Sequence, residues 1–307
     1  MSNLSQFLGG KIKKSQVITA TGTFSPSTTL IASGGWVDAF VVGGGSGGVN
    51  YDNGINTKYE YGGGGGAVCT STIQLSTTQT INVTIGAGGA LNTASNVQNN
   101  GGFTSVHWTS AVTGTVATTG GTTLTASAVN SIASKSFILI DSEIMYVSAG
   151  GGTTSLTVTR GALGSVAATH SAAVIYVIGA ASGGGQGVDS GIDYLSGTSY
   201  SGVGAVLYPG GAGYTNFYNA LGGGAGGAAF PAQGTASVVI AGTTYPAGSL
   251  GLPGQGISGF GIGGVGNTSN PDNNANGIIS TVANNSGAGG SYTVAGKSGI
   301  VILTWFE

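Results

Sequence analysis

Charged residues are scarce in this chain. Only 5% of its 307 residues are Asp, Glu, Lys or Arg, with seven basic against nine acidic side chains, whereas about 25% is usual for a globular domain. There is no basic stripe that could follow a phosphate backbone, so we expect no nucleic-acid binding. Solubility must come from Ser, Thr, Asn and backbone amides instead.

Cysteine, histidine and long apolar runs are also scarce. The single cysteine, Cys69, excludes an internal disulfide framework and a cysteine-based zinc site. The only two histidines, His107 and His170, are too few for a convincing histidine-based metal cluster. No run reaches the roughly 18 apolar residues of a membrane span, and no apolar segment follows the N-terminal lysines as in a signal peptide. We therefore expect no metal, no cofactor and no membrane span.

Glycine and strand-forming residues are abundant instead. The chain holds 63 Gly, 12 Tyr, 9 Phe and 3 Trp and is 40% hydrophobic, which argues against a disordered linker. Apolar runs and alternation predict strands at Trp36–Val42, Ile81–Ile85, Leu156–Thr159, Ala173–Ile178 and Ser298–Phe306. The first should be buried on both faces except at Asp38, and the first and last are expected in one sheet. We expect no long helix and an all-β class.

Glycine content divides the chain into parts. Between Thr109 and Ile178 only 8 of 70 residues are glycine, against 55 of the other 237. We predict an N-terminal attachment segment at 1–14 and a glycine-rich domain in two parts, 15–108 and 179–307. A small β module is inserted between them at 109–178.

The glycine runs are predicted to be a framework rather than flexible loops, which are the alternative. Each Gly in regular structure costs roughly 0.5–1 kcal/mol relative to Ala. A chain with this many glycines must therefore use them to let backbones pack closely together, as collagen does. Laterally bonded, polyglycine-II-like segments capped by strands would pair the buried amides and carbonyls. The predicted fold is thus a glycine-rich β-sandwich with packed polyglycine-II-like segments and a small β insert domain.

The framework glycines predicted from these runs are Gly43, Gly44, Gly45, Gly62, Gly63, Gly64, Gly65, Gly66, Gly183, Gly184, Gly185, Gly222, Gly223 and Gly224. We expect Gly62–Gly66 to pack beside one or more of the other three runs. Gly64→Val should then prevent folding, whereas a linker would accept it.

One pair of carboxylates raises the question of catalysis. Asp141 and Glu143 are two residues apart and share the insert with Arg160 and His170. Glycosidases use two carboxylates that flank the sugar. A surface ion pair or a turn residue is the preferred interpretation, and we expect no catalytic residues and no enzyme activity.

Aromatic residues in the stretches that interrupt the glycine runs are the candidates for receptor binding. Tyr with Ser, Gly and Asn is the composition of antibody paratopes, and loops on a rigid scaffold commonly carry recognition. The candidates are Tyr51, Tyr59, Tyr61, Tyr194, Tyr200, Tyr208, Tyr214, Phe217 and Tyr218. The alternative is that these side chains cover the glycine layer or fill subunit contacts.

Several ordered segments resemble a known family. The segments "VDAFVVGGGSGG", "YGGGGGAV", "INVTIGAGGA", "NNGGFTSV" and the closing "GKSGIVILTW" are similar to the glycine-rich domain of phage tail-fibre and tail-tip proteins. The resemblance covers about 15–108 and 179–307. Residues Ile140–Ile175 resemble a small β module of phage tail proteins.

This resemblance implies a virion component at the tail, made in the host cytoplasm and released by lysis. It implies a receptor-binding adhesin similar in kind to polyglycine-II distal adhesins. Its partners would be other phage tail proteins and a bacterial surface receptor, either a glycan or an outer-membrane protein, and a homotrimer is one assembly that such a protein could form. The alternatives are a purely structural tail subunit, an extracellular surface- or ice-binding polyglycine-II protein, and a glycan-cleaving enzyme.

Overall fold

The computed structural model describes residues 11–52, 58–77, 79–93, 99–185, 202–203, 206–208, 238–240, 243–245, 286–290 and 294–307. Within strands β4, β5, β14, β15, β16 and β17, Val49, Asn50 and Val203 are described with their side chains and the other residues by their backbone.

The described elements are almost all strands. They are β1 (Lys13–Ile18), β2 (Gly22–Phe24), α2 (Thr28–Ala32), β3 (Trp36–Val42), β4 (Val49–Asp52), β5 (Lys58–Tyr61), β6 (Val68–Gln74), β7 (Ile81–Thr84), β8 (Thr104–Val116), β9 (Thr123–Ala126), β10 (Ser136–Ile140), β11 (Glu143–Ala149), β12 (Ser155–Ala162), β13 (His170–Ser182), β14 (Gly202–Val203), β15 (Val206–Tyr208), β16 (Val238–Ile240), β17 (Thr243–Tyr245) and β18 (Ile300–Phe306). The all-β class is therefore confirmed.

The helix α2 is short, and the strand patterns did not predict it. Ser27 caps its first turn, because the Ser27 hydroxyl accepts from the Leu30 amide at 3.0 Å. Gly34 and Gly35, both with positive φ, follow its last turn. A serine cap followed after one turn by paired glycines was the available signal. The single turn buries Leu30 in the core.

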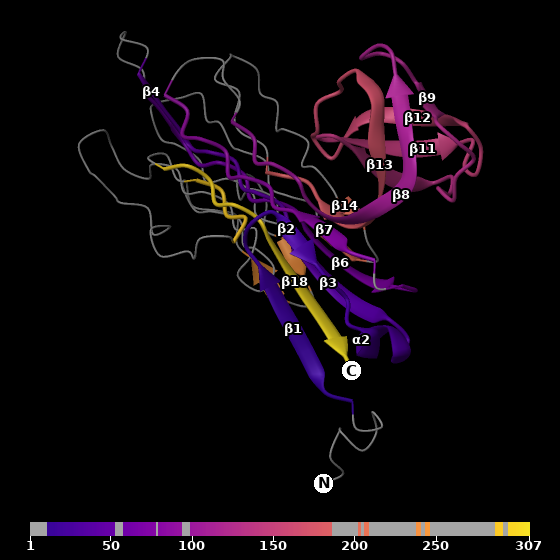
Figure 1. The fold of residues 1–307 in the computed structure, drawn as a ribbon. Coiled ribbons are helices and arrows are strands. Elements are labelled where there is room, and N and C mark those ends of the chain that lie inside the picture. Colours follow the sequence, from indigo (N-terminus) through magenta and orange to yellow (C-terminus); the bar gives the residue numbers. More distant parts are fainter. Residues whose placement is uncertain are drawn as a thin grey trace.

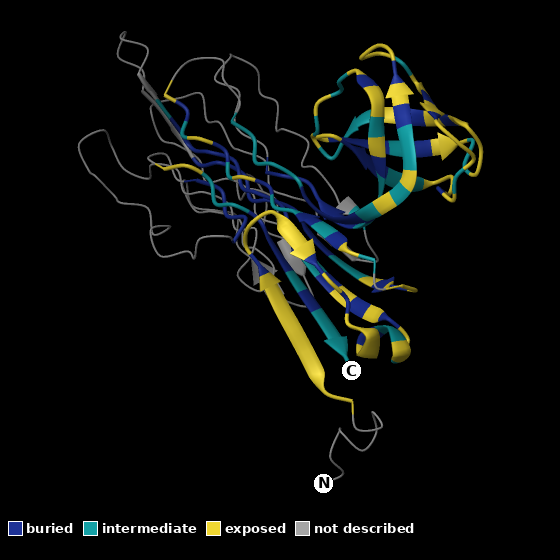
Figure 2. Cartoon of the chain, in the orientation of Figure 1, coloured by how far each residue is buried: buried dark blue, intermediate teal, exposed yellow. Residues whose placement is uncertain are grey.

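The body of the protein is a sandwich of two antiparallel sheets. One sheet has the strand order β1-β18-β3-β6-β15, and the facing layer is formed by β2, β7 and the first half of β8. A continuous apolar cluster fills the space between them, with Val41 and Leu303 from the first sheet and Val83 and Val106 from the second. Figure 2 shows this buried layer running along the strands, while β1 is exposed along most of its length.

The outer face of the five-stranded sheet corrects one expectation. The pairing of β3 with β18 is confirmed, with Val42 opposite Ile300 and Val37 opposite Trp305. Burial on both faces of Trp36–Val42 is wrong for the face that carries Trp36 and Phe40: Trp36 is 53% exposed and Phe40 is half-buried. Asp38 shares that face because side chains two apart on a strand point the same way. Its carboxylate within an apolar run was the signal of an outward face.

Beyond the sandwich, strands of both sheets continue into extended segments that lie side by side. We call this region the glycine bundle. It comprises the segments 43–48, 62–67, 86–92, 99–102, 183–185, 287–290 and 294–299. Segment 43–48 continues β3 and is buried throughout, with the other six around it.

Hydrogen bonds in the glycine bundle follow a period of three residues. The amides of 43–48 donate in rotation to three neighbouring segments over 2.8–3.2 Å: Gly43 to Ala67, Gly44 to Gly102, Gly45 to Lys297, Ser46 to Gly64, Gly47 to Asn99 and Gly48 to Val294. The carbonyls accept from the remaining three: Gly44 from Gly185, Gly45 from Gly89, Ser46 from Gly290 and Gly48 from Asn92. Three residues per turn is the period of the polyproline II helix. Every amide of the central segment is thus paired without a sheet.

The insert is a closed barrel of six strands. Its antiparallel order is β13-β10-β11-β12-β9-β8, and β8 pairs with β13 to close it. Its interior is a separate apolar cluster that includes Leu124, Ile138 and Ile175. The 13-residue strands β8 and β13 run from the body into the barrel (Figure 1). The expected boundaries, 109 and 178, therefore fall inside continuous strands.

Candidate functional site

The predicted framework glycines lie in the glycine bundle wherever the structure describes them. Gly62–Gly66 flank the central segment, and Gly183–Gly185 lie next to both, with Ala67 donating to the Gly183 carbonyl at 3.0 Å. Gly222, Gly223 and Gly224 lie outside the described residues. The sequence interpretation missed the segments near 88, 101, 288 and 296, although each contains glycine pairs or near-pairs.

Seven of these glycines leave no room for a side chain: Gly43, Gly44, Gly45, Gly63, Gly66, Gly184 and Gly185. A Cβ atom built on Gly45 would collide with the backbone of Ala288 and Gly289, and one on Gly184 with the backbone of Gly101. Gly64 accepts the Ser46 amide at its carbonyl over 2.9 Å, and the effect of Gly64→Val stays a prediction. The bundle therefore depends on close backbone approach, which only glycine allows.

The predicted tyrosines are described only in part. Tyr51, Tyr59 and Tyr61 belong to the β4–β5 hairpin, in which Tyr51 is opposite Tyr59. This hairpin connects the segments 43–48 and 62–67 and lies at the end of the glycine bundle that is farther from the sandwich (Figure 1). Tyr208 is in β15, opposite Val68. The other candidates, Tyr194, Tyr200, Tyr214, Phe217 and Tyr218, lie outside the described residues.

Of the two carboxylates of the insert, Glu143 is the centre of a buried charge cluster, and Asp141 lies exposed at its edge. Glu143 is 0% exposed, and Arg160 clamps it with Nε and Nη2 at 2.8 and 2.7 Å from the two carboxylate oxygens. The amides of Gly161 and Ala168 donate to it, each over 2.9 Å. His170 bridges the cluster, with Nε2 at 2.9 Å from Glu143 and Nδ1 at 2.8 Å from Asp141. A surface ion pair is thus the wrong interpretation of Glu143.

This cluster is a structural clamp. Asp141 is exposed and sits in a turn with φ of 51°, as the turn interpretation expects. Arg160 also donates to the Thr118 and Gly121 carbonyls at 3.0 Å, so it ties β12 to the turn before β9. A glycosidase needs both carboxylates at the sugar, whereas Glu143 has no exposed surface and both of its oxygens are already bonded.

Hydrogen bonding keeps Glu143 ionised. Burial by itself raises the pKa of the Glu143 carboxyl, but hydrogen bonds from Arg160, His170, Ala168 and Gly161 outweigh it and lower the pKa from 4.5 to about 2. Because its pKa is lower in the folded state than in the unfolded state, Glu143 stabilises the fold above pH 4.5. This contribution is lost as the pH falls from 4.5 to about 2.

A second buried group, His107, becomes protonated at a higher pH than Glu143 does. It is 5% exposed in β8 and packs edge-on against Tyr176 with ring centroids 5.1 Å apart. Burial lowers the pKa of His107 from 6.5 to about 4, partly offset by a hydrogen bond with the Ser105 backbone. The neutral ring therefore contributes stability above pH 6.5 that is lost as the pH falls through 4.

The free energy of unfolding should therefore fall in two steps on acidification. The first step, from His107, spans pH 6.5 to about 4, and the second, from Glu143, spans pH 4.5 to about 2 and is on the order of 3 kcal/mol. Urea titrations followed by circular dichroism at intervals from pH 7 to 2 measure both. His107→Gln should remove only the upper step. A profile that is flat down to pH 3 would contradict the prediction.

Cys69 is unsuited to nucleophilic chemistry. Burial raises the pKa of its thiol to about 12 and outweighs a hydrogen bond with the Ala181 backbone, which acts in the opposite direction. The thiol donates to the Val203 carbonyl at 2.9 Å. Since the thiolate is the reactive form, this cysteine acts as a packed core residue.

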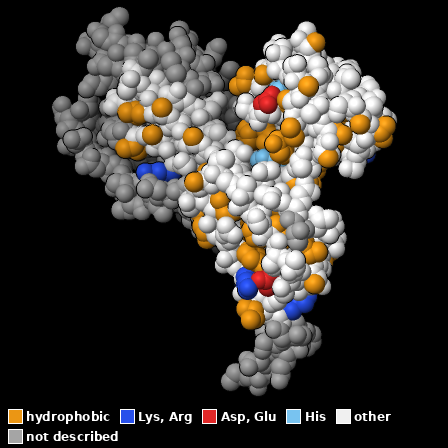
Figure 3. All heavy atoms as spheres, in the orientation of Figure 1, with side chains coloured by type: hydrophobic (Ala, Val, Ile, Leu, Met, Phe, Trp, Pro, Cys, Tyr) orange, Lys and Arg blue, Asp and Glu red, His pale blue; other side chains and the backbone are white. Residues whose placement is uncertain are grey.

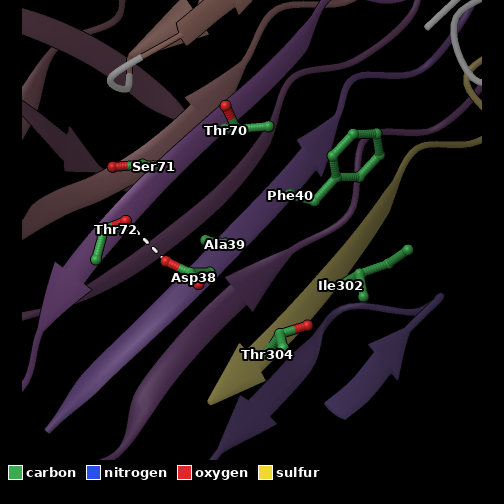
Figure 4. A pocket seen from close by; sticks show the side chains of 8 residues that line it. All are labelled: Asp38, Ala39, Phe40, Thr70, Ser71, Thr72, Ile302 and Thr304. Carbon is green, nitrogen blue, oxygen red and sulfur yellow. Dashed lines mark hydrogen bonds between the residues drawn. The ribbon is translucent and has the colours of Figure 1, made fainter. Parts of the chain in front are cut away.

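An open groove lies on the outer face of the five-stranded sheet (Figure 4). It crosses the central strands β6, β3 and β18 and has a volume of about 360 Å³. Its lining residues are Asp38, Ala39, Phe40, Thr70, Ser71, Thr72, Ile302 and Thr304. We call it the sheet groove.

Strand register places the side chains of the sheet groove in two cross-strand rows. Phe40 is opposite both Thr70 and Ile302, and Asp38 is opposite both Thr72 and Thr304. Thr72 donates to Asp38 Oδ1 at 2.7 Å. On the side of the glycine bundle the same face continues as a buried apolar cluster of Val42, Val68 and Ile300. On the other side it ends at the exposed Trp36.

The sheet groove was not among the sequence-predicted sites. The signal was the alternation of Trp36, Asp38 and Phe40, three residues on one face of a strand.

Figure 3 shows that the charged groups of this view are few and scattered, as the composition requires.

Comparison with known proteins gives no significant match, either to a protein-family model or to a curated protein. Among the residues that the structure describes, no helix is both long and apolar enough to cross a membrane. In the same residues no three His, Cys, Asp or Glu side chains gather as metal ligands.

Proposed function

We propose that this chain is a bacteriophage tail-fibre or tail-tip protein that binds a receptor on the host surface without catalysis. The observation that carries the proposal is the glycine bundle, which lies between the sandwich and the β4–β5 hairpin. At the far end of the sandwich, Ile12 and Glu307 exchange backbone hydrogen bonds at 2.7 and 3.0 Å. At the other end the β4–β5 hairpin holds three of the predicted tyrosines.

This arrangement suits a binding tip. The end of the molecule at Ile12 and Glu307 would join the rest of the tail, and the hairpin end would meet the cell. A backbone bundle that is bonded laterally in every direction holds the intervening distance fixed, and rigid scaffolds that present loops are common in recognition. In the virion the partners would be other tail proteins on one side and a surface glycan or outer-membrane protein on the other.

Loss of the tyrosines should weaken adsorption without lowering stability. In Tyr200→Ala combined with Tyr214→Ala, and separately in Tyr51→Ala combined with Tyr59→Ala, adsorption of the labelled protein to a panel of bacterial strains should drop at least about 30-fold, as expected for hot-spot residues. Thermal melting of the same variants checks the fold. Val129→Ala, at a residue 73% exposed on the barrel, is the control.

Two outcomes would contradict the adhesin proposal. Failure of the wild-type protein to adsorb to any strain, or to block infection by the parent phage, would favour a purely structural tail subunit. An equal loss of adsorption and thermal stability in the tyrosine variants would show that these side chains pack within the fold.

A further inference from the structure

The sheet groove has the chemistry of a saccharide site, and we propose that it binds a short, uncharged segment of a bacterial surface glycan. This inference rests on the proposed function and names a receptor class and a binding surface for it. The surface differs from the tyrosine-bearing hairpin, because it lies on the outer face of β3, β6 and β18.

The position of the sheet groove excludes recognition through the backbone. It lies over the three central strands of a five-stranded sheet, and the register of β3 is continuous with both β18 and β6. The ladder hydrogen bonds of these strands are therefore already made, and no free edge is available for an added peptide strand. A ligand must be held by side chains.

The charges in the sheet groove exclude anionic ligands. Among the residues that the structure describes, its lining contains one carboxylate, Asp38, and no lysine or arginine. Phosphate or sulfate groups would meet a negative charge and find no cation to pair with. Acidic sugars are disfavoured for the same reason, so the expected ligand is neutral.

The remaining side chains match the two kinds of surface on a sugar ring. Phe40 and Ile302, which face each other across β3 and β18, give an apolar floor for the C–H face of the ring. Thr70, Thr304 and Asp38 provide hydroxyl and carboxylate groups that exchange hydrogen bonds with sugar hydroxyls. Within the part of the chain that the structure describes, Asp38 Oδ2 and the Thr70 and Thr304 hydroxyls make no hydrogen bond.

The hydrogen bond between Thr72 and Asp38 prepares the carboxylate for this role. Thr72 donates to Oδ1, which fixes the carboxylate plane and leaves Oδ2 to accept from a ligand hydroxyl (Figure 4). The Thr72 oxygen retains acceptor capacity of its own. Because the acceptor is already held in place, binding costs less conformational entropy.

Trp36 extends the site along the strand. It lies two residues before Asp38, on the same face of β3, and is 53% exposed. Trp36, Asp38 and Phe40 therefore form a row of about 13 Å, with an acceptor between two aromatic side chains. The groove volume of about 360 Å³ falls within the 300–1,000 Å³ of small-ligand sites. A short oligosaccharide fits such a row better than a single sugar.

Binding to a glycan array tests the inference directly. The probes are purified O-antigen polysaccharides freed of lipid A and core, and capsular polysaccharides, neutral and acidic, followed by isothermal titration calorimetry with each neutral hit. Wild-type protein should bind at least one neutral glycan and none of the acidic ones. Trp36→Ala combined with Asp38→Asn should weaken that binding at least tenfold, and Thr70→Val combined with Thr304→Val should weaken it several-fold.

The matched control is Thr159→Val, which removes an exposed hydroxyl from strand β12 of the barrel and should leave binding unchanged. The inference is overturned if no array glycan binds, if only acidic glycans bind, or if the groove variants bind as the wild type does. Cell adsorption separates it from the proposed function. Groove variants that adsorb normally would leave the adhesin proposal standing and reject the sheet groove, whereas array binding without adsorption would do the reverse.

Discussion

Gly45→Ala is expected to prevent the glycine-rich body from folding. A Cβ at this position would run into the backbone of Ala288 and Gly289. That backbone cannot retreat easily, because the Ala288 carbonyl accepts the Lys297 amide at 2.8 Å. The collision is with main chain rather than with a flexible side chain, so the cost should exceed the ~1–3 kcal/mol of ordinary overpacking and approach the whole stability of a domain, about 5–15 kcal/mol. Thermal melting and size-exclusion chromatography measure the loss.

Two glycines outside the bundle provide matched controls. Gly120, in the turn between β8 and β9, has no heavy atom within 4 Å of an added Cβ, and at Gly22 in β2 the nearest atom is 3.8 Å away. Gly120→Ala and Gly22→Ala should change stability by no more than about 1 kcal/mol. If Gly45→Ala melted like either control, the segments would have to be loosely held.

Glu143→Met should destabilise the barrel by roughly 3–5 kcal/mol, because it leaves Arg160 buried without its partner. Both side chains are nearly inaccessible, at 0% and 8% exposure, so solvent cannot replace the lost bonds. The double variant, Glu143→Met with Arg160→Met, should recover part of the loss, since it removes both buried charges. Urea denaturation of the two single variants and the double variant gives the coupling free energy.

Asp141→Asn is the control for this cycle. Asp141 is 62% exposed at its side chain, and exposed ion pairs contribute about 0–1 kcal/mol. A loss for Glu143→Met that was no larger than for Asp141→Asn would contradict the clamp interpretation. Glu143→Gln tests the glycan-cleaving alternative, because release of reducing sugar by the wild type that disappears in this variant would require a catalytic carboxylate.

Much of the fold was predictable because its signals are local. Strand periodicity located β3, β7 and β18, and the drop in glycine content between 109 and 178 marked the stretch that forms the barrel. The juxtaposition of Gly43–Gly45 with Gly62–Gly66 followed from what glycine permits. The other segments of the bundle were harder to predict, because they mix glycine with residues such as Asn99 and Lys297 that take part through their backbone.

The candidate site depended on register, which the sequence does not display. The Trp36, Asp38 and Phe40 row becomes a groove only because β6 and β18 place Thr70 and Ile302 beside it. The fate of Glu143 depended on contacts between segments that are distant in the sequence: one amide donor, Gly161, lies near the end of β12, and the other, Ala168, lies in the loop between β12 and β13. A carboxylate two residues after another one looks the same in sequence whether it is solvated or enclosed.

The threefold rotation of partners in the glycine bundle restricts how its segments can change in length. Removing one residue from 43–48 would turn every following amide by about 120°, toward a neighbour whose carbonyls stand at a different height. Removing or adding three residues would return each amide to its own neighbour. The length of the bundle can therefore change only in steps of three residues, and related chains with longer or shorter bundles should differ by multiples of three residues in all of the segments at once.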